Sequence, residues 1–133
     1  MNEELAKTHR NRLKTQQSLE TYATTCTACE ARPGGMDDVA QGIAADIAML
    51  EDTKIMYSDD IAKRGAVIPW HNGRQNGYKE NPSMRGLTRT MEQQRKHLNE
   101  LRLTPACQRQ AKAATIEEKP RTPEDEFDEF PEP

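Results

Sequence analysis

The chain has 133 residues, of which 34% are hydrophobic and 31% charged, and its mean hydropathy is −0.99. A chain of this length corresponds to one domain, but this composition leaves little apolar surface for a thick core. The sequence therefore disfavours one compact globule and favours elongated helices that each bury a single stripe. No apolar run reaches the roughly 18 residues of a membrane-spanning helix, so we expect a cytosolic protein without a membrane partner.

The net charge of −3 conceals an uneven distribution along the chain. Residues 117–133 hold eight acidic and two basic residues, a net of −6, whereas residues 1–116 hold seventeen basic and fourteen acidic residues, a net of +3. The body could therefore meet phosphate groups while the acidic end repels them. The charge permits DNA binding without requiring it.

The first predicted element is a helix over residues 2–22, which are rich in helix formers. Its candidate DNA contacts are the basic residues Lys7, Arg10, Arg12 and Lys14. The alternative is that these residues only form a solvated helix face. Residues 22–37 are rich in threonine and then contain Pro33 and the pair Gly34-Gly35, which break a helix, so they predict a linker.

A long helix is predicted from Asp37 or Asp38 to Gly65. Apolar or long side chains recur there at alternating steps of three and four, as Ala40, Ile43, Ile47, Leu50, Lys54, Tyr57 and Ile61. The two aspartates at the start, with Lys63 and Arg64 at the end, complement a helix dipole. About 27 residues give a helix of roughly 40 Å, which needs a partner helix.

The partner helix is predicted over residues 83–102. Its stripe is Met84, Leu87, Met91, Gln94, Leu98 and Leu101. Asn81 is the expected N-cap, and Pro82 occupies the first helical position, where a missing N–H costs nothing. The two long helices are therefore predicted to pair antiparallel in an all-α dominated fold.

Residues 66–80 connect the two helices and have β-prone residues on both sides of Asn-Gly pairs, which predicts a small β-hairpin. We expect Trp70 and Tyr78 to hold this hairpin by packing across it or onto helix ends. A second candidate DNA-binding patch consists of Lys63, Arg64, Arg74 and Lys79. Neither patch contains a base-reading signature.

The end of the chain is predicted to hold a short helix from Pro105 to about Ala114, which Thr104 caps, and a disordered acidic tail over residues 116–133. The two phenylalanines of the chain, Phe127 and Phe130, lie in this tail. With Asp125 and Asp128 they predict a docking motif whose rings fill apolar pockets and whose charges speed encounter. The alternatives are a solubility tail and a DNA mimic that competes for the basic patches.

The sequence lacks the common catalytic and metal-binding patterns. It contains no Walker lysine loop, no GxSxG and no HExxH, so we expect no enzyme, no catalytic residue and no cofactor. Cys26 and Cys29 have the inner spacing of a zinc knuckle, but a closed site needs two further ligands and no second close pair exists. We therefore expect no metal, and three cysteines do not indicate a disulfide framework.

The stripes at steps of three and four on the two long helices (the helical seam) extend further than one antiparallel hairpin needs for its own packing. This excess predicts oligomerisation. The candidate interface residues are Ile43, Ile47, Leu50, Tyr57, Met91 and Leu98. Lys54 and Gln94 are polar residues at seam positions, where such residues can fix register or oligomeric state. The alternative is that both stripes simply pack within one chain.

Two stretches of the sequence occur in a distinctive order after the long helix. The first is Gly73-Arg74-Gln75-Asn76-Gly77-Tyr78-Lys79-Glu80-Asn81-Pro82-Ser83, and the second, beyond Met91, is Leu98-Asn99-Glu100-Leu101-Arg102-Leu103-Thr104-Pro105. Together they resemble the signature of a phage terminase small-subunit family, which has a turn with a lysine before Asn-Pro and a Leu-Gly-Leu-Thr-Pro-like ending. Arg102 stands where glycine is usual, and the resemblance covers roughly residues 38–110.

This resemblance implies a protein of DNA packaging. Its partners would be double-stranded phage DNA, the large terminase subunit and further copies of itself, arranged as a ring in the host cytoplasm during phage assembly. The residue patterns themselves divide the chain into an N-terminal basic helix and linker (1–36), a helical hairpin oligomerisation core (37–115) and a disordered acidic tail (116–133). The remaining alternatives are a small helical DNA-binding regulator and a structural coiled-coil phage protein.

Overall fold

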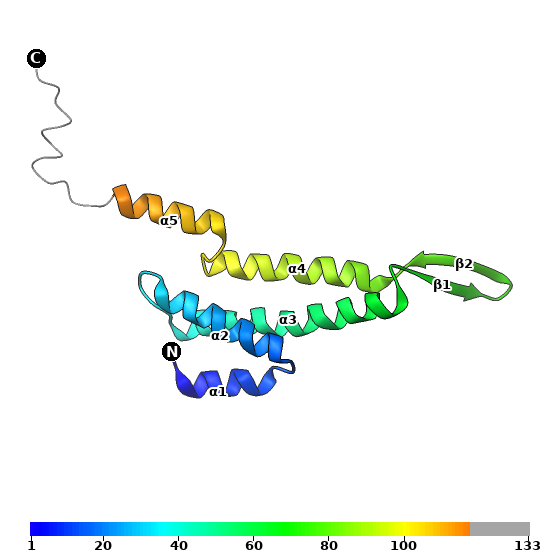
Figure 1. The fold of residues 1–133 in the computed structure, drawn as a ribbon, viewed down its shortest axis with the longest axis horizontal. Helices are drawn as coiled ribbons and strands as arrows, with labels where there is room; N and C mark the ends of the chain where they lie inside the picture. Colours follow the sequence, from blue (N-terminus) through cyan, green and yellow to red (C-terminus); the bar gives the residue numbers. More distant parts are fainter. Residues whose placement is uncertain (118–133) are drawn as a thin grey trace, which may run out of the picture. The chain divides into compact units, whose positions relative to one another are not determined.

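A computed structural model describes residues 1–117, which form five helices and one two-stranded antiparallel sheet (Figure 1). In chain order these are α1 (Glu3–Arg12), α2 (Gln16–Ala31), α3 (Asp38–Arg64), β1 (Val67–Asn72), β2 (Gln75–Glu80), α4 (Pro82–Glu100) and α5 (Pro105–Glu117). The predicted helix-dominated fold with a small β-hairpin is confirmed. The predicted acidic docking motif lies outside the described residues, and oligomerisation stays a prediction.

The predicted long helix is confirmed as α3, which has 27 residues and ends where local chemistry stops it. The side chain of Asp37 caps its start by accepting a hydrogen bond from the Ala40 N–H, at 2.7 Å. Gly65 ends it with a φ of 88°, in the left-handed region that glycine enters without steric cost. The boundaries of α3 therefore follow from its own sequence.

Helix α4 returns antiparallel along α3, with the β-hairpin at the connection (Figure 1). Asn81 caps α4 and Pro82 occupies its first turn, as predicted. The strands pair from Val67 opposite Glu80 to Asn72 opposite Gln75, and Gly73 at the turn has a φ of 62°. The helix ends two residues before the predicted Arg102.

The N-terminal region differs from the prediction of one helix followed by a linker. The predicted helix over residues 2–22 is broken at Leu13, and a second helix starts after Thr15, whose hydroxyl forms a capping box with Ser18. The linker prediction for residues 22–37 was wrong, because α2 continues to Ala31. Its buried face contacts α3, and this tertiary packing holds threonine-rich sequence in a helix.

The core consists of two small clusters, both built on α3. One joins α1 and α2 to the alanines of α3, through Ala6, Leu13, Tyr22, Cys26, Ala44, Ala45 and Ala48. The other lies nearer the end of α4 and contains Cys29, Ala40, Ile47 and Leu101. These thin cores match the low apolar content of the sequence.

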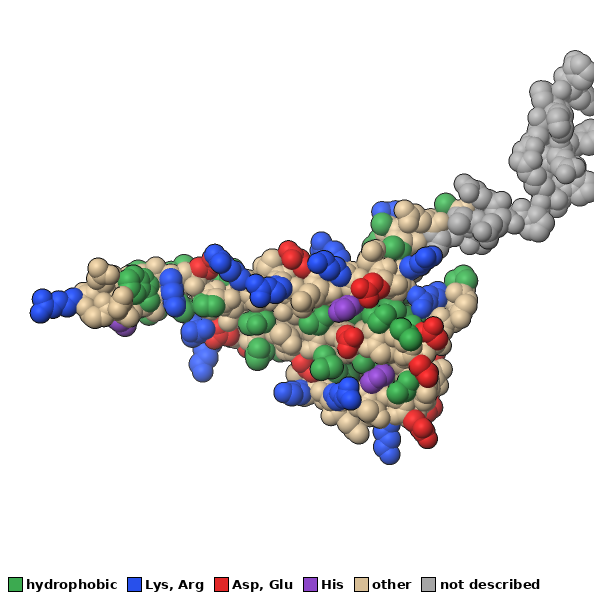
Figure 2. Space-filling model, turned by 180° about the vertical axis from the view of Figure 1, so that it is seen from behind, with side chains coloured by type: hydrophobic (Ala, Val, Ile, Leu, Met, Phe, Trp, Pro, Cys, Tyr) green, Lys and Arg blue, Asp and Glu red, His purple; other side chains and the backbone are tan. Residues whose placement is uncertain are grey.

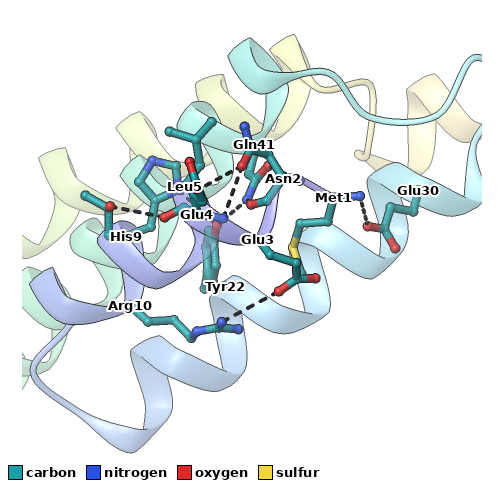
Figure 3. Close-up of polar contacts among 11 residues, drawn as sticks. Met1, Asn2, Glu3, Glu4, Leu5, His9, Arg10, Tyr22, Glu30 and Gln41 are labelled. Carbon is teal, nitrogen blue, oxygen red and sulfur yellow. Dashed lines mark hydrogen bonds and ion pairs between the residues drawn. The ribbon is translucent and has the colours of Figure 1, made fainter.

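A polar network fixes the start of the chain to α2 and α3 (Figure 3). The side-chain amide of Gln41 pairs with the backbone of Asn2, accepting from its N–H at 3.0 Å and donating to its C=O at 2.9 Å. The same Gln41 Nε2 lies 3.1 Å from the hydroxyl of Tyr22, and that hydroxyl lies 2.9 Å from Nδ1 of His9. Gln41 is 1% exposed and Tyr22 is 1% exposed, so α1 is held by satisfied buried groups.

The chain divides into two compact units, Met1–Leu103 and the residues from Thr104 onward. In the second unit, Thr104 accepts a hydrogen bond from the Cys107 N–H, and α5 starts at Pro105 as predicted but continues to Glu117. Whether residues 1–36, 37–115 and 116–133 act as separate functional regions stays a prediction. No helix within residues 1–117 is long and apolar enough to cross a membrane.

Candidate nucleic-acid interface

A hydrogen-bonded junction fixes the β-hairpin to the helix pair. Asp60 on α3 accepts two hydrogen bonds from the Arg64 guanidinium, at 2.7 and 2.8 Å, and a third from the Ser83 hydroxyl at 2.6 Å. Asn81 is fully buried and donates to both Asp60 and the Gly65 C=O. The Arg64 and Ser83 hydrogen bonds hold the pKa of Asp60 well below its ordinary value.

This junction affects two residues of the predicted hairpin patch. The guanidinium of Arg64 is occupied by Asp60 and also donates to Asn81 Oδ1 at 3.2 Å, so part of its hydrogen-bonding capacity is used within the chain. The neighbouring Lys63 is exposed. The role of Arg64 and Lys63 in DNA binding stays a prediction.

The hairpin presents the other two predicted residues, Arg74 and Lys79, which are both exposed. Arg74 lies in the turn after Gly73, and Lys79 lies on β2 opposite Ile68. Trp70 packs across the sheet onto Gly77, where an added Cβ would lie 2.7 Å from the indole nitrogen. The prediction that Tyr78 also packs was wrong, because this side chain is 79% exposed opposite Pro69.

A basic stripe on α4 was absent from the sequence predictions. Its exposed residues are Arg85, Arg89, Arg95 and Lys96. Arg85, Arg89 and Lys96 are spaced by four and seven, so they share one face of the helix. The side chain of Arg85 is 82% exposed. Its contact with the Glu80 carboxylate, at 3.9 Å, is at the limit of an ion pair. This spacing can be found in the sequence, but the basic residues do not form a continuous run there, because polar and apolar residues separate them.

The N-terminal patch is also exposed at Lys7, Arg10, Arg12 and Lys14. Arg10 lies 4.0 Å from Glu3, a weak contact between two exposed side chains. The backbone N–H of Lys14 donates to Asp52 on α3, which leaves its ammonium group outside that contact. This patch belongs to a helix that also carries Glu3 and Glu4, and the α4 stripe lies beside Glu80 and Glu92.

Figure 2 shows lysine and arginine side chains along the arm that the β-hairpin and α4 form. Helix α4 has four lysines and arginines against two acids, whereas α3 has three against six. The two antiparallel helices therefore present opposite charges. The arm formed by α4 and the hairpin is the better candidate surface for a polyanion.

The predicted oligomerisation residues are placed differently within the chain. Ile47 is 2% exposed and belongs to the core, while Ile43, Leu50, Tyr57 and Leu98 are half-buried and Met91 is 48% exposed. Gln94 donates to the Ile47 C=O and to Glu51, which also pairs with Lys54 at 2.9 Å. Lys54 and Gln94, the two polar residues at seam positions, therefore both contact Glu51 of the same chain.

Cys26 and Cys29 lie on the buried face of α2. Burial raises the pKa of both thiols and so favours their protonated form. Among the described residues, no group of three or more His, Cys, Asp or Glu side chains could hold a metal ion.

Comparison with known proteins gives one match. The family described as "Phage terminase, small subunit" matches residues 20–118, which include α2 from Glu20 onward, α3, the hairpin, α4 and α5. No curated protein and no solved structure matches the chain.

Proposed function

This chain belongs to the phage terminase small-subunit family, and on that premise we propose that it is the non-catalytic, DNA-binding subunit of a packaging machine. Membership places it in phage DNA packaging inside the host cell. We propose further that it assembles into a ring in the host cytoplasm and recruits and regulates the large motor and nuclease subunit.

The observation that supports DNA binding is the exposed basic arm, defined as Arg74, Lys79, Arg85, Arg89, Arg95 and Lys96. From Arg85 to Lys96 the α4 part of this arm rises by about 16 Å, at 1.5 Å per residue. A duplex presents one phosphate charge per about 1.7 Å of its axis, so several phosphates lie within that length. The arm therefore suits contact with the DNA backbone rather than with base edges.

Contacts of this kind are weak in one subunit and become strong when several subunits hold one duplex. A homo-oligomer multiplies them by raising the effective concentration of every further patch. This is the physical reason for proposing a ring. It also predicts affinity that depends strongly on salt, because each neutralised phosphate releases counterions.

The test compares two sets of charge-removing changes. Arg85→Gln with Arg89→Gln and Lys96→Gln should lower the salt slope of log Kd by about 2.7 for each engaged subunit, at about 0.9 per phosphate contact. The matched set changes Lys7, Arg10, Arg12 and Lys14 to Gln. If only the second set alters the affinity and the slope, the N-terminal patch is the DNA surface and the basic arm is not.

The proposed contact with the large subunit rests on the sequence of the tail, which lies outside the described residues. Truncation before Pro123 should spare assembly and DNA binding but abolish capture of the large subunit. Changing Phe127 and Phe130 to alanine should cause most of that loss, whereas changing Asp125 and Asp128 to Asn should mainly slow association. Equal capture by the truncated and intact proteins would contradict this contact.

A further inference from the structure

We infer that the tip of the β-hairpin, defined as residues 71–76, enters the major groove of double-stranded DNA and contacts the edges of the bases. The inference rests on the DNA binding proposed above and deepens it. The basic arm binds the backbone whatever the sequence, and the hairpin tip lets the protein choose among sequences. The two parts of one surface then have different tasks, because backbone contacts position a protein and base contacts specify the sequence.

The hairpin changes in composition from its base to its tip. Residues 67–70 are apolar, whereas every side chain of the hairpin tip is polar and all six of its residues are exposed, with Gly73 as its one residue without a side chain. No acidic residue occurs from residue 65 to residue 79, in a chain with 22 acidic residues among 133. A turn that is merely solvated accepts aspartate readily, so the lack of acids favours a surface that meets a polyanion.

The strand register gathers five hydrogen-bonding side chains at this tip. They are Arg74 in the two-residue turn and the cross-strand pairs Asn72 with Gln75 and His71 with Asn76. In the major groove, arginine pairs with guanine, and asparagine or glutamine pairs with adenine. No sequence signature marks these residues, because their common place at one tip depends on the register.

Both cross-strand pairs can bond to a base. Among the described residues, the side chains of Asn72 and Gln75 form no hydrogen bond. In the second pair, Nδ1 of His71 lies 2.7 Å from Oδ1 of Asn76. The neutral ring then carries its proton on Nδ1, so Nε2 is an acceptor beside the amide donors of Asn76. An acceptor next to a donor matches adenine, which presents N7 and its amino group in the major groove.

The dimensions of the hairpin fit the major groove rather than the minor groove. One β-layer with its side chains is about 10 Å thick. The major groove is about 12 Å wide, while the minor groove is about 6 Å wide. The major groove is also about 8.5 Å deep, and each residue of a strand adds about 3.4 Å. The turn and the two cross-strand pairs behind it therefore fill the depth of the groove, and these are the residues of the hairpin tip.

The hairpin is fixed at its base and projects at its tip. The Asn81 N–H donates to the Ala66 C=O at 2.7 Å, and the Asn81 side chain donates to the Gly65 C=O at 2.9 Å. Within the sheet, Trp70 packs on Gly77. Figure 1 shows the strands extending beyond the ends of α3 and α4, so these helices leave the tip open. A fixed support allows side chains to discriminate between bases, because their positions are set before binding.

Arg74 is the exception within the basic arm, because it lies in the turn and enters the groove first. Lys79 lies in the fifth cross-strand pair from the turn. At about 3.4 Å per residue it is about 14 Å behind the first pair, beyond the depth of the groove. Lys79 and the basic residues of α4 therefore remain at the level of the phosphates while the tip contacts the bases.

The test first selects a DNA sequence. Full-length protein is mixed with a library of duplexes that contain a random central segment, and the bound fraction is sequenced. The wild type should enrich a short motif. The enriched duplex should bind about 5- to 100-fold more tightly than a scrambled duplex of the same composition, which is the discrimination that one good pairing of a side chain with a base supplies.

The key variant is Asn72→Ala with Gln75→Ala, which alters no charge and breaks no hydrogen bond among the described side chains. It should lose most of the preference for the enriched duplex, and circular dichroism should show an unchanged fold. Gln93→Ala removes another exposed amide, on α4, and is the matched control that should keep the preference. Lys79→Gln should weaken both duplexes equally and lower the salt slope by about 0.9 for each engaged subunit, because it removes a backbone contact.

A second probe identifies the groove. The enriched duplex is rebuilt with 7-deazapurines, which replace N7 by carbon and leave the backbone and the minor-groove edges unchanged. The wild type should lose most of its preference for this duplex, because N7 is an acceptor of the major groove. Equal binding of the natural and the 7-deaza duplex by the wild type would place the tip outside the major groove and overturn the inference.

The remaining outcomes separate this inference from the proposed function. An enriched motif that the double variant still prefers would overturn it, because another part of the chain then reads the bases. Salt-dependent duplex binding without an enriched motif, or tighter binding of the separated strands, would also overturn it while leaving the proposed DNA binding in place. A wild type that binds neither duplex nor single strands would overturn the proposed DNA binding and this inference together.

Discussion

Helix α3 is covered on two sides by layers that pack in different ways. Helices α1 and α2 pack on its small residues, Ala44, Ala45 and Ala48, with Tyr22 as the largest buried side chain. Helix α4 packs with larger side chains and a buried polar contact, in which Gln94 bonds to Glu51. The first layer depends on close approach of helices, and the second on caps and directed hydrogen bonds.

This difference explains why the sequence predicts the α4 layer but not the α1 and α2 layer. The start of α4 is determined by local residues, a cap followed by proline, and such residues can be recognised in the sequence. The α1 and α2 layer is built from alanine, threonine and cysteine, whose packing emerges only when the helices meet. The predictions below separate the two layers, starting with the largest expected effect.

Tyr22→Ala should destabilise the α1 and α2 layer by about 3 to 5 kcal/mol, the usual cost of removing a large buried ring. Urea unfolding measures this cost, and hydrogen exchange should show lost protection in α2 while α3 and α4 keep theirs. Tyr22→Phe keeps the ring and should cost only about 1 to 2 kcal/mol, for the lost hydrogen bonds. An equal loss of protection in α4 would show that the layers are not separable.

Asn81→Ala tests the anchor of the α4 layer and should cost about 2 to 3 kcal/mol. The change removes the α4 cap and leaves the Gly65 C=O without its buried donor. The measurement is again the free energy of unfolding in urea. Ser83→Ala, which removes one hydrogen bond to Asp60, should cost about 1 kcal/mol. A larger effect at Ser83 than at Asn81 would refute the ranking.

The boundaries of α3 and α4 were predictable, because they are determined by residues that lie at the helix ends and act on their neighbours in the sequence. These residues are Asp37, Gly65, Asn81 and Pro82. The helix α2 was not predictable, because Cys26 and Cys29 contribute no helical signal without Ala44 and Ala40, with which they form the two core clusters. The break at Leu13 was missed for the same reason, since its side chain is buried by contacts with other helices. Tertiary packing therefore overrides propensity in this layer.

The candidate interface was partly predictable. Arg74 and Lys79 were proposed from their place in a hairpin, and both are exposed. Arg85 and Arg89 were missed although residues 83–102 were predicted to be helical and a spacing of four places both arginines on one face of that helix. The hydrogen bonds of Arg64 with Asp60 follow an ordinary four-residue helical pair, but its contact with Asn81 needed the fold.

Arg102→Gly should stabilise the end of the α4 layer by about 1 kcal/mol. Arg102 has a φ of 58°, and the Leu103 N–H returns to the Leu98 C=O, a helix ending that usually employs glycine. The family resemblance also has glycine at this position. Thermal unfolding should rank Gly above Ala here, because both changes remove the same side chain and only glycine relieves the backbone. An alanine variant as stable as the glycine variant would contradict this explanation.

The last prediction concerns the pH dependence of the α1 and α2 layer through His9. Burial lowers the pKa of His9 below its ordinary value, and the nearby charge of Arg12 lowers it further. The Tyr22 hydroxyl accepts a hydrogen bond from Gln41, so its own proton can be donated to a neutral His9 Nδ1. Protonation of His9 would remove that acceptor.

The sign of the effect follows from the lowered pKa. Above about pH 6.5 the imidazole is neutral in both the folded and the unfolded chain, and the stability is complete. As the pH falls through 6.5 the unfolded chain takes up the proton first, so the folded state loses stability until the folded pKa is passed. The measurement is the difference in urea midpoint between the wild type and His9→Gln, in which titration of the carboxylates cancels. This difference should favour the wild type more at pH 7.5 than at pH 5, and parallel profiles would show that His9 does not couple protonation to the N-terminal layer.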